Sequence, residues 1–354
     1  MSSTPETNGY LEEVEATLAS VLVDTSPPGR VDGEMIMTAA RHLCVSGGGK
    51  RIRPLLVHHF GAALGVPAER LVRIGVAAEL IHSASLLHDD VVDAGMFRRG
   101  RPTVNSLWGN VVAVMSGDMV LTVALQQLTA LDMQLTLDAL ACVHEMTRGT
   151  IAELEARGDL DMPIPRMRVV ADGKTGALFA FCGIAAAHMA KDETAAAAFE
   201  EFGRRLGIAF QIADDVKDLV ALDEGKPRFA DLASKTPSLP VLIAAHKSPE
   251  LKRRILDAWS FGELRAERLR ELGLAVIETG AVDEAIRMMK AEVSAALEAF
   301  RPYAETAGGL ALVGYARQLE AAFDERHDRA DRERSGHEGH AVDGTEAARE
   351  RRAV

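Results

Sequence analysis

The chain has 354 residues, of which 47% are hydrophobic and 26% charged, a composition typical of globular proteins with a sizeable core. This composition excludes a collagen-like or wholly disordered chain. Forty Lys and Arg stand against 52 Asp and Glu, which gives a net charge of −12. Because phosphate backbones attract basic surfaces, this charge argues against nucleic acid as the main partner.

The sequence has no feature that predicts secretion or membrane insertion. No continuous apolar run reaches the 18 residues of a membrane-spanning helix, and the opening MSSTPETNGY lacks the basic and then apolar order of a signal peptide. We therefore expect a cytoplasmic protein with no stable membrane insertion. Cys44, Cys142 and Cys182 are far apart and match no metal-binding spacing, so they are predicted to be buried thiols.

Three regions follow one another along the chain. We expect a partly helical N-terminal segment over 1–30, the main domain over 31–324, and a disordered charged tail over 325–354, where there is almost nothing to bury. In the main domain, apolar residues recur every three or four positions, which predicts successive helices packed as a single-domain, all-α bundle. The stretch 71–92 is apolar around most of its circumference and is predicted to be a central helix.

The first chemically informative segment is GGGKRIRP at 47–54. It is not a Walker loop, because the glycine five residues before the GK pair is absent and Arg51 replaces the metal-binding Ser or Thr. A glycine-rich turn with Lys50, Arg51 and Arg53 is still suited to an oxyanion, which backbone N–H groups and arginine forks can hold.

Two matching aspartate clusters are the strongest signal in the sequence. Residues 86–93 (LLHDDVVD) carry Asp at i, i+1 and i+4, and 212–218 (IADDVKD) repeat this spacing. On a helix the first and last carboxylates then share one face. Like charges so placed destabilise a helix, so a cation is expected between the clusters, and carboxylates that bridge to substrate phosphates are typical of magnesium. The aspartates are Asp89, Asp90, Asp93, Asp214, Asp215 and Asp218.

Further cations follow in chain order. They are Arg98, Arg99, Arg101, Lys174, Lys226 and Lys235. Lys217 lies inside the second aspartate cluster, about 100° around the helix from its centre, and is expected to point aside. Cations on either side of two carboxylate groups predict a site for two polyanionic ligands.

With these motifs in order, the sequence resembles the all-trans isoprenyl diphosphate synthases, more closely the polyprenyl branch than the farnesyl branch. The match runs through GGGKRIRP, ELIHSASLLHDDVVDAGMFRRGRPTVN, GKTGALF, GIAFQIADDVKD and a GKP…DL…SLP segment, over roughly 40–245. The resemblance implies an all-α fold with a central cavity, usually as a homodimer. It also implies a Mg²⁺-dependent prenyltransferase that condenses an allylic diphosphate with isopentenyl diphosphate into a trans-polyprenyl diphosphate longer than farnesyl diphosphate.

The resemblance assigns roles residue by residue. The six clustered aspartates would bind magnesium and, through it, the allylic diphosphate. The catalytic candidates are Asp89, Asp90, Lys174 and Asp214. The allylic diphosphate would also contact Arg98, Lys174, Thr175, Gln211 and Lys235. Isopentenyl diphosphate would be held by Lys50, Arg53, His82 and Arg99.

The sequence departs from the family pattern at two places. Where the family usually reads GExxQ, this chain has Gly149, Thr150 and Glu153, so any contact made there is changed. The late family lysine normally stands two residues before the Ser or Thr of the (S/T)LP run. Here that position is Thr236, and Lys235 comes one residue earlier.

Small residues one turn before the first aspartate cluster bear on product length. In this family the growing chain passes that turn, and farnesyl-type enzymes carry aromatic residues there. Ala84 and Ser85 leave the path open, which favours a product longer than farnesyl diphosphate. Its end would be set by deeper residues such as Met119, Val123 or Leu125.

Two other functions are compatible with the motifs. A related enzyme would cyclise the prenyl chain or transfer it to a non-isoprenoid acceptor. Cyclases stabilise migrating cations on aromatic faces, and this chain has only two Trp and three Tyr. A non-catalytic subunit of a heteromeric synthase is the third class, but such subunits commonly lose the aspartate motifs, which are both intact here.

Overall fold

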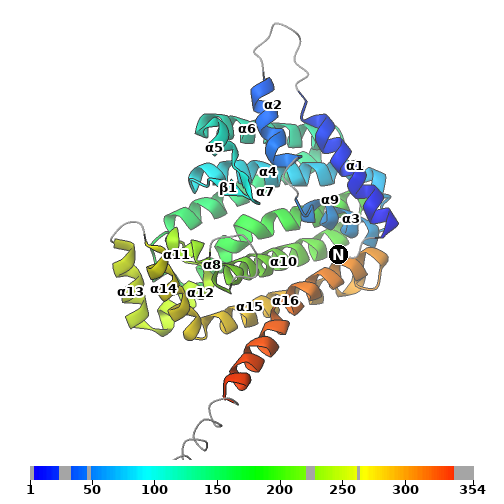
Figure 1. The fold of residues 1–354 in the computed structure, drawn as a ribbon. Helices are drawn as coiled ribbons and strands as arrows, with labels where there is room; N and C mark the ends of the chain where they lie inside the picture. The colour runs from blue at the N-terminus through cyan, green and yellow to red at the C-terminus, as the bar shows by residue number, and fades with distance from the viewer. Residues whose placement is uncertain (1–3, 24–32, 46–48, 221–227, 261–263, 339–354) are drawn as a thin grey trace, which may run out of the picture.

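The computed structural model describes residues 4–23, 33–45, 49–220, 228–260 and 264–338, with only the backbone described over 324–338. The predicted all-α fold is confirmed (Figure 1). Its α-helices are α1 (Pro5–Val21), α2 (Glu34–Cys44), α3 (Ile52–Ala63), α4 (Val72–Val92), α5 (Val104–Trp108), α6 (Asn110–Thr129), α7 (Met133–Glu155), α8 (Ile164–Ala171), α9 (Ala177–Ala190), α10 (Glu193–Val220), α11 (Ala230–Ala233), α12 (Leu239–Lys247), α13 (Pro249–Ser260), α14 (Ala266–Glu278), α15 (Ala281–Ala299) and α16 (Ala307–Glu338).

Short elements complete the fold. They are the 3₁₀ turns η1 (Ala68–Arg70) and η3 (Arg301–Tyr303), the π-helical turn η2 (Asp172–Gly176), and an antiparallel hairpin of β1 (Phe97–Arg98) and β2 (Arg101–Pro102). The hairpin directly follows α4, and η2 continues into α9. Both therefore carry residues of the predicted site.

The core is built around the two helices that carry the aspartate clusters. α4 packs on α6 and α3, while α10 packs on α9 and α15. The predicted central helix is confirmed as α4, since most of its residues are buried. Phe60, Phe202 and Phe300 meet with ring centroids 4.7–5.9 Å apart, which joins α3, α10 and the end of α15.

Close helix packing around η2 depends on glycine. A Cβ at Gly149 of α7 would lie 2.5 Å from the backbone nitrogen of Lys174, and a Cβ at Gly207 of α10 would lie 2.6 Å from the Cα of Gly176. Both distances are shorter than any side chain tolerates. The glycines therefore let α7 and α10 close on the turn that carries Lys174 and Thr175.

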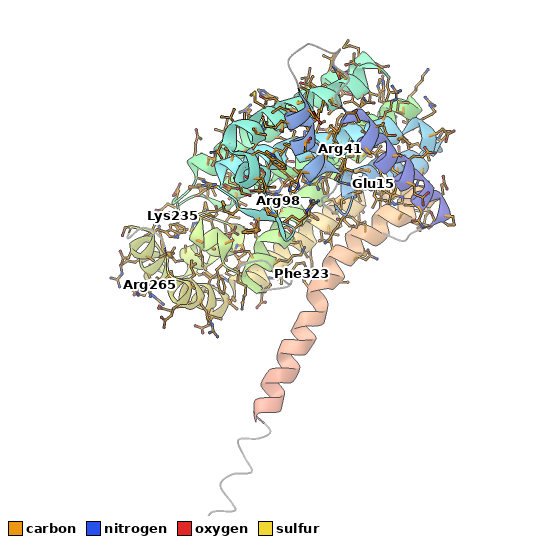
Figure 2. The ribbon with its side chains drawn as sticks, turned by 45° about the horizontal axis from the view of Figure 1, so that its top comes forward. Glu15, Arg41, Arg98, Lys235, Arg265 and Phe323 are labelled. Carbon is orange, nitrogen blue, oxygen red and sulfur yellow. The ribbon has the colours of Figure 1, made fainter. Side chains whose placement is uncertain are left out.

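The N-terminal segment is partly helical, as predicted, whereas the C-terminal end differs from the prediction. Over 1–30, α1 packs on α3 and α4 as part of the main body. At the other end, α16 continues through 325–338, where disorder is expected. Helical backbone bonds are local and need no burial, and Ala, Arg and Glu favour helix. The helix leaves the body near Phe323 (Figures 1 and 2), and residues 339–354 lie outside the described part.

Burial accounts for the cysteines and for one of the two long apolar stretches. Cys44, Cys142 and Cys182 are free and buried, as predicted. Two stretches, Asn110–Thr129 and Ile164–Ala190, are long and apolar enough to span a membrane by length and composition. The second is 72% buried inside the fold, as a core helix of a globular protein would be.

Candidate active site

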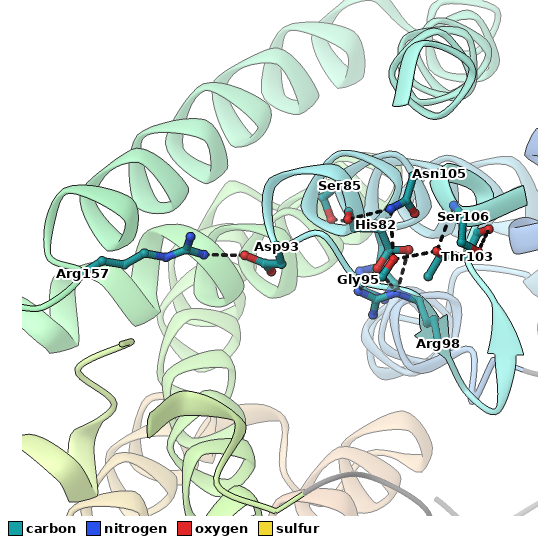
Figure 3. A network of polar contacts seen from close by, with 10 residues as sticks. His82, Ser85, Asp93, Gly95, Arg98, Thr103, Asn105, Ser106 and Arg157 are labelled. Carbon is teal, nitrogen blue, oxygen red and sulfur yellow. Dashed lines mark hydrogen bonds and ion pairs between the residues drawn. The ribbon is translucent and has the colours of Figure 1, made fainter. Parts of the chain in front are cut away.

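The first aspartate cluster lies at the C-terminal end of α4. The backbone N–H of Asp93 caps the helix by donating to the carbonyl of Asp89 at 2.8 Å. Asp90 is buried, and Arg98 grips its carboxylate with contacts of 2.7–3.1 Å. Asp93 is half exposed and pairs with Arg157, which reaches over from the end of α7 (Figure 3). Asp89 has no side-chain hydrogen bond or ion pair within the described residues.

The loop after α4 folds back onto this cluster. Asn105 donates through its side-chain amide to the carbonyls of Asp90 and Gly95 at 3.1 and 3.0 Å, and Thr103 donates to Gly95 at 2.7 Å. These bonds hold the hairpin that carries Arg98 against α4 (Figure 3). Sequence reasoning assigned no role to Thr103 or Asn105, although both stand in the matched RRGRPTVN motif.

The second cluster lies on α10, and its three aspartates differ in exposure and in their hydrogen-bond partners. Asp214 is exposed and lies 3.3 Å from the ammonium of Lys217. Lys217 therefore does not point aside as expected, because its i+3 position brings it back over Asp214. Asp218 accepts the backbone N–H groups of Ala230 and Asp231 at 2.8 and 3.2 Å, so its oxygens hold the first turn of α11.

Asp215 is the most buried carboxylate of the second cluster. It accepts from Gln211 at 3.0 Å and from the backbone N–H of Leu239 at 3.1 Å. Burial raises its pKa to about 7, although both hydrogen bonds work in the opposite direction. Thr175 donates to the amide oxygen of Gln211 at 2.9 Å. A continuous hydrogen-bonded chain thus joins the KT pair to the second aspartate cluster.

Lys174 lies between the two clusters. Its ammonium donates to Glu153 at 2.5 Å. Burial opposes its charge, but Glu153 and Asp89 outweigh burial and raise the pKa of Lys174. Burial also raises the pKa of Asp89, with a smaller opposing effect from Lys174 and a reinforcing one from Glu153. Glu153 also raises the pKa of Asp215, so its charge acts on carboxylates of both clusters.

Arg53 and Arg99 lie near enough to His82 of α4 for their charges to affect it. Burial lowers the pKa of Arg53, whose guanidinium lies 5.3 Å from the ring centroid of Phe179 and whose Nε lacks an acceptor within the described chain. Burial, and then the charges of Arg53 and Arg99, hold the pKa of His82 well below its usual value. Three of the four residues predicted to hold isopentenyl diphosphate therefore act on one another's charge, and Glu79 partly offsets the positive charge of both arginines.

Lys50 and Arg51 are neighbours with opposite surroundings. Lys50, the fourth predicted residue of this subsite, is exposed. Arg51 is buried and binds Glu15 at 2.5 Å, Glu79 at 2.8 Å and the carbonyl of Cys44 at 2.9 Å. Arg51 therefore holds α1, α2 and α4 together and is not free to bind a ligand.

The comparisons with known proteins agree on one family. The polyprenyl synthetase family model matches residues 34–272. An octaprenyl diphosphate synthase from Haemophilus influenzae is 35% identical over 277 residues, covering 77% of this chain and 84% of that protein. The chain belongs to the polyprenyl synthetase family. The predicted family and the prenyltransferase class of enzyme are thereby confirmed, and the cyclase and non-catalytic alternatives are not favoured.

Solved structures of polyprenyl synthetases share this fold. A decaprenyl diphosphate synthase from Rhodobacter capsulatus superposes with a TM-score of 0.81 at 25% identity, covering 89% of this chain and 96% of that one. A Caulobacter crescentus polyprenyl synthase, solved with calcium and isoprenyl diphosphate, gives 0.82 at 25% identity, covering 88% and 94%. The bundle described here is therefore the polyprenyl synthetase fold.

Other predicted residues of the polyprenyl synthetase site lie less directly in it. The ammonium of Lys235 donates to the carbonyl of Trp259 at 2.6 Å, so its contact with a diphosphate stays a prediction. Ala84 is buried and Ser85 half-buried on α4, where the hydroxyl of Ser85 donates to the carbonyl of His82 at 2.8 Å. Lys226 lies outside the described residues.

Three residues near the site were missed by sequence reasoning. Burial and the neighbouring Asp215 and Asp218 raise the pKa of Asp231 well above its usual value, and its only signal was the matched DL pair. Burial raises the pKa of Tyr315 on α16 to about 12, and this phenol feels the charges of Arg53 and Asp214. Arg157 had no signal, because its partner Asp93 is 64 residues away in sequence.

Proposed function

We propose that the protein is a Mg²⁺-dependent prenyltransferase that condenses an allylic diphosphate with isopentenyl diphosphate in the cytoplasm, as a homodimer, and makes a product longer than farnesyl diphosphate. The observation that supports it best is the turn that carries the KT pair. Thr175 is hydrogen-bonded through Gln211 to Asp215 of the second cluster, while Lys174 pairs with Glu153 and its charge acts on Asp89 of the first.

The carboxylates divide into two groups. Asp90, Asp215 and Asp218 already bond to Arg98 or to protein N–H groups. The other three aspartates have carboxylate oxygens available for magnesium. Asp93 and Asp214 are exposed, and Asp89 has no side-chain donor within the described residues. No three His, Cys, Asp or Glu side chains in the described residues form a ready-made metal site. The donors that these aspartates offer are carboxylate oxygens, the ligands that Mg²⁺ prefers, so their chemistry fits a divalent ion.

The reaction follows from the charges. Bound divalent ions would neutralise the negative charge that develops on the departing diphosphate. Lys174 lies beside Asp89 and would stabilise the same leaving oxygens. Arg53, which is desolvated and has no carboxylate partner among the described residues, would hold the acceptor diphosphate together with Lys50, His82 and Arg99. The double bond of the acceptor then attacks the allylic cation, and loss of a proton completes one five-carbon extension.

The length of the product is proposed from the small residues on α4. Ala84 and Ser85 precede Asp89 by about one turn, so they would line the path of the growing chain. The H. influenzae and R. capsulatus relatives are named octaprenyl and decaprenyl diphosphate synthases, which supports a long product. Among the deeper candidates, Val123 is buried, whereas Met119 is 38% exposed.

A homodimer is proposed from an exposed apolar stripe on two neighbouring helices. α6 and α7 pack against each other, and their exposed large apolar side chains are Val111, Met115, Met119, Met133, Leu137, Leu140 and Ile151. Exposed apolar patches of this kind mark interfaces. Because the stripe includes residues of Asn110–Thr129, a second copy would also cover the more exposed of the two long apolar helices.

The test is the metal dependence of turnover. Excess chelator should abolish product formation, and Asp214→Ala should lower turnover by at least about a hundredfold while the helical circular dichroism stays unchanged. Asp257→Ala, on α13 far from the clusters in sequence, is the matched control and should keep wild-type turnover. Full activity in chelator would sink the proposal.

A further inference from the structure

The end of α7 places two charged side chains of opposite sign beside the aspartate clusters. Glu153 and Arg157 are one helical turn apart. Glu153 pairs with Lys174, and Arg157 extends across to the end of α4 to pair with Asp93 (Figure 3). Glu153 occupies the position where the family pattern has glutamine. Arg157 belongs to none of the matched motifs.

The surroundings of Arg157 leave part of its hydrogen-bonding capacity unused. Its side chain is 30% exposed, and one Nη donates to Asp93. Its Nε is buried and has no partner in the described part of the chain. A buried N–H without an acceptor is unfavourable, and a guanidinium fork can serve several oxygens at once. The position therefore suits a ligand that brings oxygen atoms to the side of Asp93.

The backbone on which Arg157 stands is fixed. Gly158 has φ of +82°, a left-handed conformation that glycine adopts without strain. Its N–H donates to the carbonyl of Lys235 at 2.9 Å. The connection after α7 is thus tied to the segment before α12, and only the side chain of Arg157 is free to change partners.

The charge at Asp93 determines whether Arg157 pairs with that carboxylate or with another anion. The guanidinium neutralises Asp93, one of the carboxylates that would hold magnesium. A divalent ion at Asp93 competes with Arg157 for the same oxygens, and the displaced guanidinium stays beside them. We propose that Arg157 is a further binding residue for the allylic diphosphate: it neutralises Asp93 until a divalent ion takes that carboxylate, and then binds the diphosphate oxygens. This rests on the proposed metal-dependent function.

The experiment measures ligand binding without turnover. Mn²⁺ is titrated by electron paramagnetic resonance, and inorganic diphosphate is titrated by calorimetry at saturating Mn²⁺. Arg157→Gln should bind Mn²⁺ alone at least about threefold more tightly, because the competing cation is gone. It should bind diphosphate about tenfold more weakly, as expected for the loss of a charge-assisted fork. Arg73→Gln, an exposed arginine at the far end of α4, is the control and should match wild type in both titrations.

Kinetics separate the two substrates. Arg157→Gln should raise the KM for the allylic diphosphate about tenfold and that for isopentenyl diphosphate less than twofold. Arg157→Lys keeps the charge without the fork. It should keep the wild-type Mn²⁺ affinity and lose only part of the diphosphate affinity, and this variant serves if the glutamine variant does not fold.

Two results would overturn the inference. Unchanged diphosphate affinity in both variants would mean that Arg157 only ties α7 to α4. Weaker Mn²⁺ binding in Arg157→Gln would mean that Arg157 braces Asp93 rather than competing for it. If wild-type protein binds neither Mn²⁺ nor diphosphate, the proposed function itself fails, and the inference fails with it.

Discussion

Two consecutive residues, Lys50 and Arg51, have different surroundings within one basic segment, and only Lys50 is proposed to bind a ligand. Arg51 caps α3 with φ of +49°, and its guanidinium is buried between Glu15 and Glu79. Burial opposes its charge, but the hydrogen bonds and charges of the two glutamates prevail and raise its pKa. The exposed Lys50 next to it has no such constraint. The arrangement fixes the turn from which Lys50 and Arg53 extend.

Substitution of Arg51 should lower the stability of the protein rather than act first on its affinity for isopentenyl diphosphate. Arg51→Ala removes the guanidinium that bonds to Glu79, which is 4% exposed, so the free energy of unfolding should fall by about 3–5 kcal/mol. Arg51→Met with Glu79→Gln removes both charges and should recover at least half of that loss. Urea denaturation followed by circular dichroism measures both.

Lys50→Met is the matched control for Arg51. Its unfolding free energy should stay within about 0.5 kcal/mol of wild type, because surface changes cost little. Its KM for isopentenyl diphosphate should rise. Equal destabilisation by Lys50→Met and Arg51→Ala would contradict the division of roles.

Among the elements, the π-helical turn η2 both packs tightly between helices and carries residues of the predicted site. It carries Lys174 and Thr175 and is pressed between α7 and α10 at Gly149 and Gly207. Arg204 of α10 bonds to Glu145 at 2.9 Å and to Asp172 at 3.4 Å. Arg204 thereby holds the first residue of η2 in place. π-Helical turns are frequent at functional sites.

Gly149→Ala should disturb this turn directly. The added methyl would lie 2.5 Å from the backbone nitrogen of Lys174, and backbone cannot yield as a flexible side chain can. We expect a loss of about 1–3 kcal/mol in stability and a fall in kcat that exceeds the change in KM for isopentenyl diphosphate. Denaturation curves and steady-state kinetics measure the two effects.

Gly314→Ala on α16 is the control for this substitution. Nothing lies within 4 Å of its added methyl, so the protein should gain about 0.5–1 kcal/mol from the lower backbone entropy of the unfolded chain. If both alanine variants behave alike, the close approach at Gly149 has no role in holding Lys174.

The helices and the aspartate pattern were predictable, but the partners of the aspartates were not. Spacing alone places Asp89 with Asp93, and Asp214 with Asp218, because helix geometry is local. Asp215 instead bonds to the N–H of Leu239, and Asp93 pairs with Arg157. Such pairings depend on tertiary packing of segments far apart in the sequence, which periodicity does not encode. The resemblance likewise supplied no role for these partners.

At the scale of the whole molecule, one apolar surface remains to be covered. The stripe on α6 and α7 includes Val111, which is 77% exposed, and Met133, which is 59% exposed. Burying such side chains against a second copy contributes roughly 25 cal/mol per Å² of apolar area. The proposed homodimer is the arrangement that covers both helices at once.

Charge on this stripe should separate the subunits. Val111→Glu with Met115→Glu should change the mass measured by light scattering from that of a dimer to that of a monomer, because desolvating two carboxylates opposes association. Leu274→Glu adds charge at another exposed apolar position, on α14, and should leave the dimer intact. A wild-type protein that is monomeric at micromolar concentration would rule out the stripe as its interface.

The length of the product shows whether this enzyme extends its chain beyond farnesyl diphosphate. Purified protein is incubated with Mg²⁺, labelled isopentenyl diphosphate and each allylic diphosphate in turn, and the products are sized by chromatography. We predict products longer than farnesyl diphosphate from the wild-type protein and shorter ones from Ala84→Phe, whose ring would cross the path along α4. Wild-type products that stop at farnesyl diphosphate, or no condensation with any starter, would contradict the account.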